Sequence, residues 1–501
     1  MRHVRIAALG AATFLVVGGA AVLTAPAAQA ESIGWQHRNT DFDGNGYDDV
    51  VVAAPSATIS GVQWAGYVAV QYSSSSGVST TKKTLLSQNT SGVPGAAEAA
   101  DGFGKAVASG DLNGDKYDDL VVGVPGEDLG TLSNAGGATV FWGSSTGLHG
   151  SDSTWLQSIE PRAGANFGKA LEAAMYFAPD PTDPELVRHD SIAALENDEL
   201  MFFTYDSTAQ TAAESLKATA AGARGLGALA DEATITLMNL SHGNYNEDPY
   251  ADLAFSGVIN ADGGPVGITF VAHGAQNFED MSDGGTFYQG PSIVSSDFNS
   301  DGQDDLAIGD TTENSAPAGG SVSVYLGQGD LSGLSNTPAL TWTQNTPGIP
   351  GGNENGDEWG ADLSAGDTNG DNLPDLAIGA PGEDIGSVKD AGAVTVLRGA
   401  PGPAGLTTTG AVSFNQNTYR IPGGAEAGDR FGGEVRLTDA NGDKLFGLLA
   451  AAPGENTGDG FVWVIPAVRG TGLVAKGTWT YNGATLGGPT ANAKFGSAID
   501  E

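Results

Sequence analysis

Short runs of apolar and β-branched residues recur along the chain, separated by stretches rich in Gly, Pro and acidic residues. Leu120–Val124 and Leu376–Ala380 are two such runs, and a proline follows each. An A-G-x-V-T-V segment, as in Ala391–Leu397, comes next, and a later segment contains W-x-Q, as at Trp155 and Trp342. Together with a short segment after an F-G or W-G pair, these runs predict four short β-strands per unit.

The segments return in the same order as a long repeat. Neighbouring regular copies of the acidic stretch lie 70 or 72 residues apart, and they begin at Asp41, Asp111, Asp297, Asp367 and Asp439. The 186 residues between the second and third copies hold two degenerate units, about residues 171–290, since Phe167-Gly-Lys-Ala repeats Phe103-Gly-Lys-Ala. Seven units of four strands predict an all-β, seven-bladed β-propeller. The alternative, a linear β array, would need capping units, and none is evident.

The two ends of the repeat predict that the ring is closed. The first unit lacks an F-G segment before Asp41, and the chain ends in Phe495-Gly-Ser-Ala-Ile, an F-G segment with no acidic stretch after it. We therefore expect the C-terminal strand to complete the first blade. This closure would hide two sheet edges that could otherwise pair with another chain.

The acidic stretch has nine positions with oxygen-bearing side chains at one, three, five and nine. A tight loop can aim these alternate side chains at one point, and the carbonyl of position seven can join them. With a water, this gives the six or seven oxygens that suit Ca²⁺, whereas Mg²⁺ demands a stricter octahedron. The chain has no Cys and few His, so zinc and copper are poor candidates. The predicted calcium ligands are Asp41, Asp43, Asn45, Tyr47 and Asp49; Asp111, Asn113, Asp115, Tyr117 and Asp119; Asp297, Asn299, Asp301, Gln303 and Asp305; and Asp367, Asn369, Asp371, Leu373 and Asp375.

An Asx turn without an ion is the alternative, because Asp, Asn and Gly favour turns by themselves. Four matching loops at one repeat position favour calcium. A weaker fifth site is predicted at Asp439, Asn441 and Asp443, because Gly447 stands where position nine should be acidic.

The third and fourth loops, near 175–190 and 239–252, are expected to have lost the spacing. Asp180 and Asp183 do not fit the pattern. No metal is therefore assigned to either loop.

The F-G pairs, the D-x-[DN]-x-D loops and the G-[AV]-P endings, at Gly123-Val-Pro and Gly379-Ala-Pro, resemble the FG-GAP repeats of integrin α-subunit propellers. The resemblance covers nearly the whole mature chain and is specific in five of the seven units. It implies a seven-bladed propeller held by structural calcium, and it leaves the ligand open. The family also includes secreted bacterial proteins and a propeller attached to glycosylphosphatidylinositol-specific phospholipase D.

The composition limits the classes of partner, and the N-terminal sequence predicts where the protein is located. The 501 residues include 60 Asp+Glu and 21 Lys+Arg, and the net charge of -39 argues against nucleic acid or anionic membrane as partner. Arg2 and Arg5, the apolar Ile6–Leu23 and the small residues at Ala28-Gln-Ala30 predict a signal peptide, residues 1–30, before a propeller at 31–501. An uncleaved anchor is the alternative. We expect a secreted monomer with no membrane span after cleavage.

The blade ends opposite the acidic loops are also predicted to be acidic. Because strands alternate in direction, these ends collect Glu98, Asp101, Glu127, Asp128, Glu354, Asp357, Glu383, Asp384, Glu426, Asp429 and Glu455. Such a face suits a cationic or metal-bridged ligand, although the same acids could serve only solubility. The predicted function is integrin-like adhesion or recognition of an extracellular protein or glycan, with a lectin-like propeller as the alternative.

A hydrolase related to the phospholipase is the remaining alternative, and no catalytic residues are assigned. Gly143-Ser-Ser-Thr-Gly147 matches G-x-S-x-G but falls between two predicted strands, whereas a nucleophile elbow joins a strand to a helix. The histidines are scattered. Catalysis is therefore not the expected activity.

Overall fold

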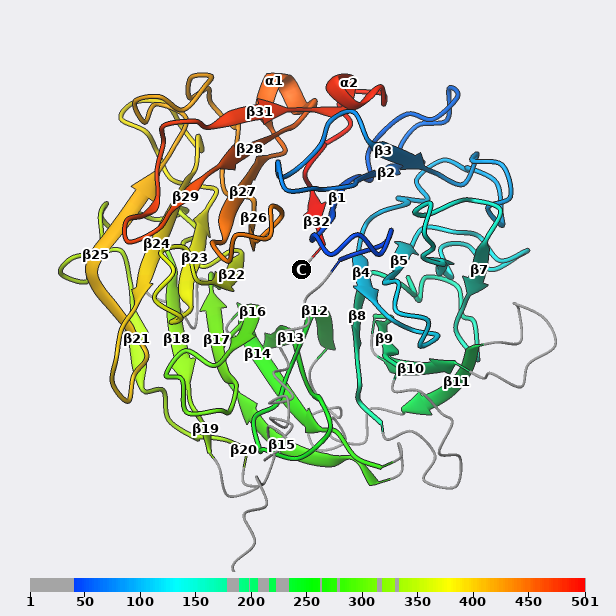
Figure 1. Ribbon diagram of the computed structural model, residues 1–501. Coiled ribbons are helices and arrows are strands. Elements are labelled where there is room, and N and C mark those ends of the chain that lie inside the picture. Colours follow the sequence, from blue (N-terminus) through cyan, green and yellow to red (C-terminus); the bar gives the residue numbers. More distant parts are fainter. Residues whose placement is uncertain are drawn as a thin grey trace, which may run out of the picture. The chain divides into compact units, whose positions relative to one another are not determined.

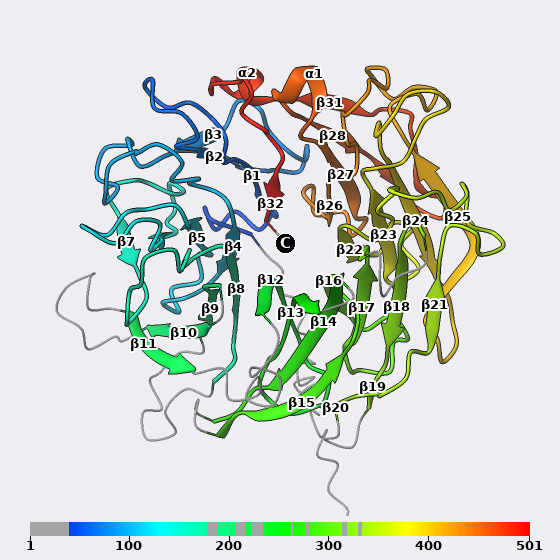
Figure 2. The same cartoon turned by 180° about the vertical axis from the view of Figure 1, so that it is seen from behind.

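The computed structural model describes residues 40–177, 189–197, 199–205, 216–221, 234–261, 264–276, 280–312, 318–328 and 333–500. The chain divides after His37, and the described residues belong to the unit Arg38–Glu501. Within them, seven four-stranded antiparallel sheets are arranged as blades around a centre (Figures 1 and 2). The expected all-β, seven-bladed propeller is confirmed.

Each blade runs outward from its first to its fourth strand, and the chain ends in the first blade. Blade one contains β32 (Ala498–Ile499), β1 (Val50–Ala54), β2 (Tyr67–Gln71) and β3 (Lys83–Leu86). Blade two contains β4 (Val107–Gly110), β5 (Asp119–Val124), β6 (Gly137–Phe141) and β7 (Ser153–Leu156). Blade three contains β8 (Ala170–Ala174), β9 (Ser191–Leu195), β10 (Leu200–Tyr205) and β11 (Leu216–Ala221).

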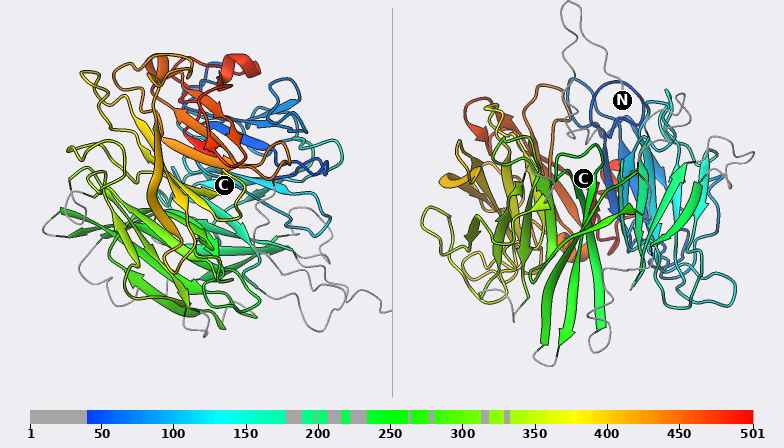
Figure 3. Two further views of the ribbon diagram at one scale, coloured as in Figure 1. Left: turned by 60° about the vertical axis from the view of Figure 1, so that its left-hand side comes forward. Right: turned by 90° about the horizontal axis from the view of Figure 1, so that it is seen from below.

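Blade four holds the longest described strands, which Figure 3 shows in green. They are β12 (Thr234–Gly243), β13 (Asp252–Ala261) and β14 (Gly264–His273), followed by β15 (Ser282–Phe287). Blade five contains β16 (Pro291–Ser296), β17 (Asp305–Asp310), β18 (Ser321–Tyr325) and β21 (Leu340–Trp342), with β19 (Gly327–Gln328) and β20 (Gly333–Leu334) paired beside it.

The last two blades follow the same plan. Blade six contains β22 (Leu363–Gly366), β23 (Asp375–Ala380), β24 (Ala393–Gly399) and β25 (Leu406–Phe414). Blade seven contains β26 (Glu434–Thr438), β27 (Gly447–Ala452), β28 (Phe461–Ile465) and β31 (Trp479–Tyr481), with the pair β29 (Ala467–Val468) and β30 (Gly472–Leu473). The described residues also include the short helix α2 (Gly483–Leu486) and the segment α1 (Glu455–Gly458), in which Asn456 and Thr457 have left-handed backbone angles.

Ring closure occurs as expected from the two ends of the repeat. β1 pairs with β32 through Val52 opposite Ile499 and Ala53 opposite Ala498. Asn482 caps α2 with a capping box just before the closing segment. Because β32 comes from the C-terminus, the first and last parts of the described chain are held in one sheet.

The core lies between neighbouring sheets. Second strands such as β1 and β5 are buried along their whole length, because each blade packs against another on both sides. This explains why they are continuous apolar runs rather than alternating ones. No helix in the described part of the chain is long and apolar enough to cross a membrane.

Packing and backbone geometry explain why the F-G pairs recur. The aromatic ring of each pair is fully buried, as at Phe103, Phe431 and Phe495. Gly104 adopts a φ of 88°, and an added Cβ would lie 2.8 Å from a methyl carbon of Val68. The pair therefore places a ring in the core while its glycine accepts a tight, left-handed backbone.

Candidate metal centre

The acidic loops lie at one end of the blades, between the first and second strands. In the five regular loops, position one closes the loop by accepting backbone N–H groups with both carboxylate oxygens. In the first loop, Asp41 Oδ1 accepts from Asn45 N at 2.9 Å and Oδ2 from Gly46 N at 2.7 Å. Asp297 accepts from Asp301 N and Gly302 N in the same way, both at 3.0 Å. The repeated sequence therefore encodes a repeated Asx-type turn.

Position nine has a different task, because its buried carboxylate joins the loop to the third strand. Asp49 is 1% exposed, and it accepts from Phe42 N at 3.1 Å and from Ser73 N at 2.7 Å. Equivalent bonds from the loop and from the end of the third strand reach the carboxylates of Asp119, Asp305 and Asp375. Each of these residues is therefore a structural fastener whether or not an ion is bound.

The first loop also brings carboxylates together. Ligand atoms of Asp41, Asp43 and Asp49 all lie within 4.8 Å of one another. Calcium holds oxygens at about 2.3–2.6 Å, so oxygens on opposite sides of the ion are about 5 Å apart. Burial, with repulsion from Asp43 and Asp41, raises the pKa of Asp49 to about 8. A cation at this point would offset that charge, so these residues fit calcium.

Basic side chains already form ion pairs with two of the four loops that carry predicted calcium ligands. The Lys82 ammonium forms an ion pair with Asp43 in the first loop. In the sixth loop, Nη1 of Arg398 lies 3.2 Å from Oδ2 of Asp375. These groups would compete with an ion for the same oxygens. The loops are therefore expected to differ in their affinity for calcium.

The other predicted ligands form the same turn, with asparagine rather than aspartate at position three of the second, fifth and sixth loops. Position five accepts from the N–H of position seven at 3.0 Å in Asn45–Tyr47, Asp115–Tyr117, Asp301–Gln303 and Asp371–Leu373. Among the described residues, three carboxylates with ligand atoms within 4.8 Å of one another occur only in the first loop. Four occupied sites, and the carbonyl ligands at position seven, stay predictions.

The expectation that the fourth loop has lost its spacing is wrong. Asn244, Asn246, Asp248, Tyr250 and Asp252 occupy positions one, three, five, seven and nine. Asp252 accepts from Tyr245 N at 2.9 Å and Gly274 N at 2.9 Å, the two bonds that mark position nine elsewhere. The pattern escaped notice because asparagine replaces aspartate at position one. In the third loop, Asp180 and Asp183 lie outside the described residues.

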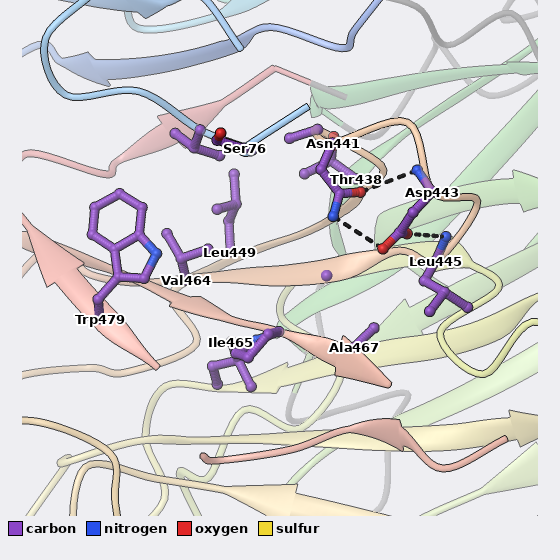
Figure 4. A pocket seen from close by; sticks show the side chains of 15 residues that line it. Ser76, Thr438, Asn441, Asp443, Leu445, Leu449, Val464, Ile465, Ala467 and Trp479 are labelled. Atoms are coloured by element: carbon purple, nitrogen blue, oxygen red, sulfur yellow. Dashed lines mark hydrogen bonds between the residues drawn. The ribbon is translucent and has the colours of Figure 1, made fainter. Parts of the chain in front are cut away.

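The seventh loop keeps the turn but has glycine, Gly447, in place of the position-nine carboxylate. Asp439 Oδ1 accepts from Asp443 N at 3.0 Å, and Asp443 Oδ1 accepts from Leu445 N at 2.9 Å. Beside Gly447 lies a cavity of about 170 Å³ (Figure 4). Trp479 stands at one end of this cavity, and Asn441 and Asp443 stand at the other. The missing ninth carboxylate has therefore left an accessible space.

Position eight was overlooked in the sequence, and it links neighbouring blades. Asp118 Oδ2 accepts from Asp41 N at 2.8 Å, and Asp118 N donates back to Asp41 O at 3.3 Å. The same two bonds join Asp190 to Asp111 and Asp304 to Asn244. The paired aspartates in D-D-L could have signalled this, since one faces its own loop and the other faces the preceding loop.

Nine of the eleven acids predicted for the opposite face fall into two groups, and the other two, Glu383 and Asp384, are half-buried. Glu98, Asp128, Glu354 and Glu426 are exposed, as a rim that serves solubility would be. The carboxylates of Asp101, Asp357, Asp429, Glu127 and Glu455 are buried. Solubility alone therefore does not account for the second group.

Known proteins share the repeat. The FG-GAP repeat family model matches residues 35–70, 103–141 and 359–397. The chain therefore contains FG-GAP repeats in at least these three segments. FG-GAP repeats often bind calcium, which agrees with the fit of the first loop.

Relatives of this FG-GAP protein are distant. Phosphatidylinositol-glycan-specific phospholipase D of Mus musculus is 31% identical over 115 residues, which are 23% of this chain and 13% of the relative. The Rattus norvegicus enzyme is 31% identical over 142 residues, 28% of this chain and 17% of the relative. The chain thus aligns with less than a fifth of either enzyme.

One solved structure aligns over most of the chain, with low similarity. The V. cholerae biofilm matrix protein Bap1 shows 11% sequence identity, 92% coverage of both chains and a TM-score of 0.23.

Proposed function

We propose that this FG-GAP protein is a secreted, calcium-stiffened propeller that recognises an extracellular protein or glycan, as in adhesion. The observation that carries the calcium part is the convergence of Asp41, Asp43 and Asp49 within 4.8 Å. The other predicted loops would add sites according to their ligand sets. Calcium would supply positive charge at fixed points and hold each loop against its third strand.

The acidic blade ends opposite the loops supply the recognition part. They present exposed carboxylates from several blades, such as Glu98, Glu354 and Glu426, on a protein whose net charge is -39. Such a surface attracts cationic groups and metal-bridged ligands. Binding loops carried on a rigid scaffold are a usual arrangement for recognition.

A pull-down from extracellular matrix or cell wall tests the proposal. Ligand capture with calcium, and its loss in a calcium-free arm, would support a calcium-stiffened recognition module. Crosslinking should then place the ligand on the acidic ends. Capture that is equal in both arms, or crosslinks confined to the acidic loops, would contradict it.

A lectin-like activity is the second candidate, because the cavity of blade seven combines an indole with polar side chains. Trp479 could stack on a sugar ring while Asn441 and Asp443 hydrogen-bond its hydroxyls. A glycan array would show binding that the Trp479→Ala substitution removes. The exposed Trp64, far along the chain from this cavity, is the matched control for losing an indole.

A hydrolase activity is suggested only by the name of the distant phospholipase relatives. An esterase and phosphodiesterase screen of the whole chain tests it.

A further inference from the structure

Three side-chain clusters repeat on the blade ends opposite the acidic loops. Each contains a glutamine, an aspartate thirteen residues later and a glutamate 39 residues after the glutamine. The glutamine and aspartate come from the link between two blades, and the glutamate from the second blade's loop between strands two and three. The clusters are Gln88, Asp101 and Glu127; Gln344, Asp357 and Glu383; and Gln416, Asp429 and Glu455.

The clusters are built tightly into the fold. Gly126 N donates to Asp101 O at 3.0 Å, and the same 3.0 Å bond joins Gly382 to Asp357 and Gly454 to Asp429. A Cβ added to Gly126 would lie 2.0 Å from a carbonyl oxygen of the link. Only glycine allows this approach, which brings the following glutamate against the aspartate of the link.

Each cluster brings together two carboxyl groups without a basic partner in the described part of the structure, and of the six residues only Glu383 is half-buried rather than buried. Asp101 is 1% exposed and Glu127 is 9% exposed. No ion pair in the described part of the structure involves either residue. Asp429 and Glu455 are close enough to share a hydrogen bond between their carboxyl groups. Two buried charges so close together need a compensating positive charge or a proton.

The glutamine adds an oxygen that lacks a partner. Nε2 of Gln88 donates to Glu127 at 2.6 Å, and Nε2 of Gln344 donates to Glu383 at 2.7 Å. Each carboxamide is therefore inserted into its cluster. These three glutamines are at least 97% buried. Oε1 of Gln88, of Gln344 and of Gln416 is enclosed and accepts no hydrogen bond. Three equivalent orphan oxygens are unusual, since buried polar atoms are nearly always paired.

The degenerate third blade shows what replaces this arrangement. Counted back from the F-G pair, Ala165 stands in place of Asp101 and Arg162 in place of Glu98. The guanidinium of Arg162 forms an ion pair with Glu196, a buried carboxylate in the loop between β9 and β10. In the third blade, which lacks the cluster, a cationic side chain thus pairs with a buried glutamate of the loop between the second and third strands.

We propose that the three glutamine–aspartate–glutamate clusters are binding sites for a hard divalent cation of the calcium class, separate from the acidic loops. A half-turn of the carboxamide exchanges Nε2 and Oε1, so that a carboxamide oxygen and two carboxylates face one ion. Oxygen ligands of these kinds are those that calcium takes in proteins. The ions would join blade one to two, five to six and six to seven at the end opposite the loops.

Counting bound ions tests the proposal on the whole protein. Calcium-45 uptake is measured by equilibrium dialysis at about 1 mM free calcium, a concentration suited to extracellular sites. The test variant carries Glu127→Gln, Glu383→Gln and Glu455→Gln together. The matched control carries Glu98→Gln, Glu354→Gln and Glu426→Gln, which remove the same charge from exposed side chains in the same links.

The test variant should bind three fewer equivalents than wild type, and the control should bind the same number as wild type. Equal uptake by test variant and wild type overturns the proposal and means that the clusters hold protons. Equal losses in both variants also overturn it, because non-specific attraction of calcium to the negative surface charge would then explain the uptake. If the triple variant does not fold, each single substitution should remove one equivalent, and no loss in any of them overturns the proposal.

This outcome is independent of the proposed function. If the acidic loops bind nothing, wild type still takes up the three equivalents that the test variant loses. If only the loops bind, the test variant keeps the full uptake of wild type.

Discussion

The first and seventh loops are neighbours around the ring and differ at one decisive position. Both keep the turn that an aspartate at position one closes, at Asp41 and Asp439. In the first loop, Asp49 fills the space below the turn and fastens the loop to the third strand. In the seventh, Gly447 leaves that space as a cavity of about 170 Å³. The turn therefore forms without a carboxylate at position nine, whereas the bonds that join the first loop to its third strand depend on that carboxylate.

The largest effect should come from removing calcium. A ligand that binds only the folded state adds about 2.7 kcal/mol per site when its concentration is 100 times Kd. Protein stripped in metal-free buffer should melt at a lower temperature, and added calcium should restore the melting temperature with measurable uptake by calorimetry. An unchanged melting temperature without uptake would refute calcium at the first loop and at every similar loop.

Substituting Asp49 should give the next largest loss. Asp49→Ala leaves the buried N–H groups of Phe42 and Ser73 without an acceptor, at about 1–3 kcal/mol for each group. Asp49→Asn keeps an acceptor oxygen and should cost less. Urea unfolding in metal-free buffer measures both without a contribution from calcium. Equal stability of Asp49→Ala and wild type would show that this carboxylate is not a fastener.

The pH dependence of the stripped protein should report the same carboxylate. Burial raises the pKa of Asp49 to about 8, above the value of about 3.9 in an unfolded chain, so the folded state holds the proton more tightly. The stability from this group is present below about pH 4 and is lost as the pH rises toward 8. Thermal melts across this range should differ in slope, because wild type loses stability as the pH rises and Asp49→Asn has no carboxyl group to titrate at this position. Identical slopes would contradict the assignment.

Adding the missing carboxylate should bring the seventh loop closer to the first. An added Cβ at Gly447 would lie 3.3 Å from Ile465 O, and the backbone there is not left-handed, so the Gly447→Asp substitution needs only a small shift. We expect one more bound calcium and a smaller cavity. Gly447→Asn fills the same volume without charge and should add no calcium. Equal uptake by the two variants would show that volume matters more than charge.

The smallest effect is expected at Lys82, which pairs with Asp43 in the first loop. The side chain of Lys82 is 62% exposed, so Lys82→Met should change stability by less than about 1 kcal/mol. Calcium should bind this loop more tightly once the competing ammonium is gone. Titration calorimetry of wild type and variant provides the comparison, and weaker binding by the variant would count against the competition.

A comparison of the regular and the degenerate blades shows which features the sequence predicts and which it does not. The repeat predicted seven blades and the closing strand, because strand length, turn residues and the F-G pair are local features. The fourth loop was missed, since asparagine at Asn244 hides a pattern that the structure shows intact. Of the predicted calcium ligands, the structure brings Asp41, Asp43 and Asp49 together.

The sequence alone determined the repeated turn and the order of the strands, because each nine-residue loop makes most of its hydrogen bonds within itself. The tertiary structure decided which acids are buried and what they meet. Asp118 meets a loop 77 positions away, and Gln88 meets Glu127 39 positions away in the next blade. Burial and charge compensation depend on these neighbours, which spacing along the chain does not reveal.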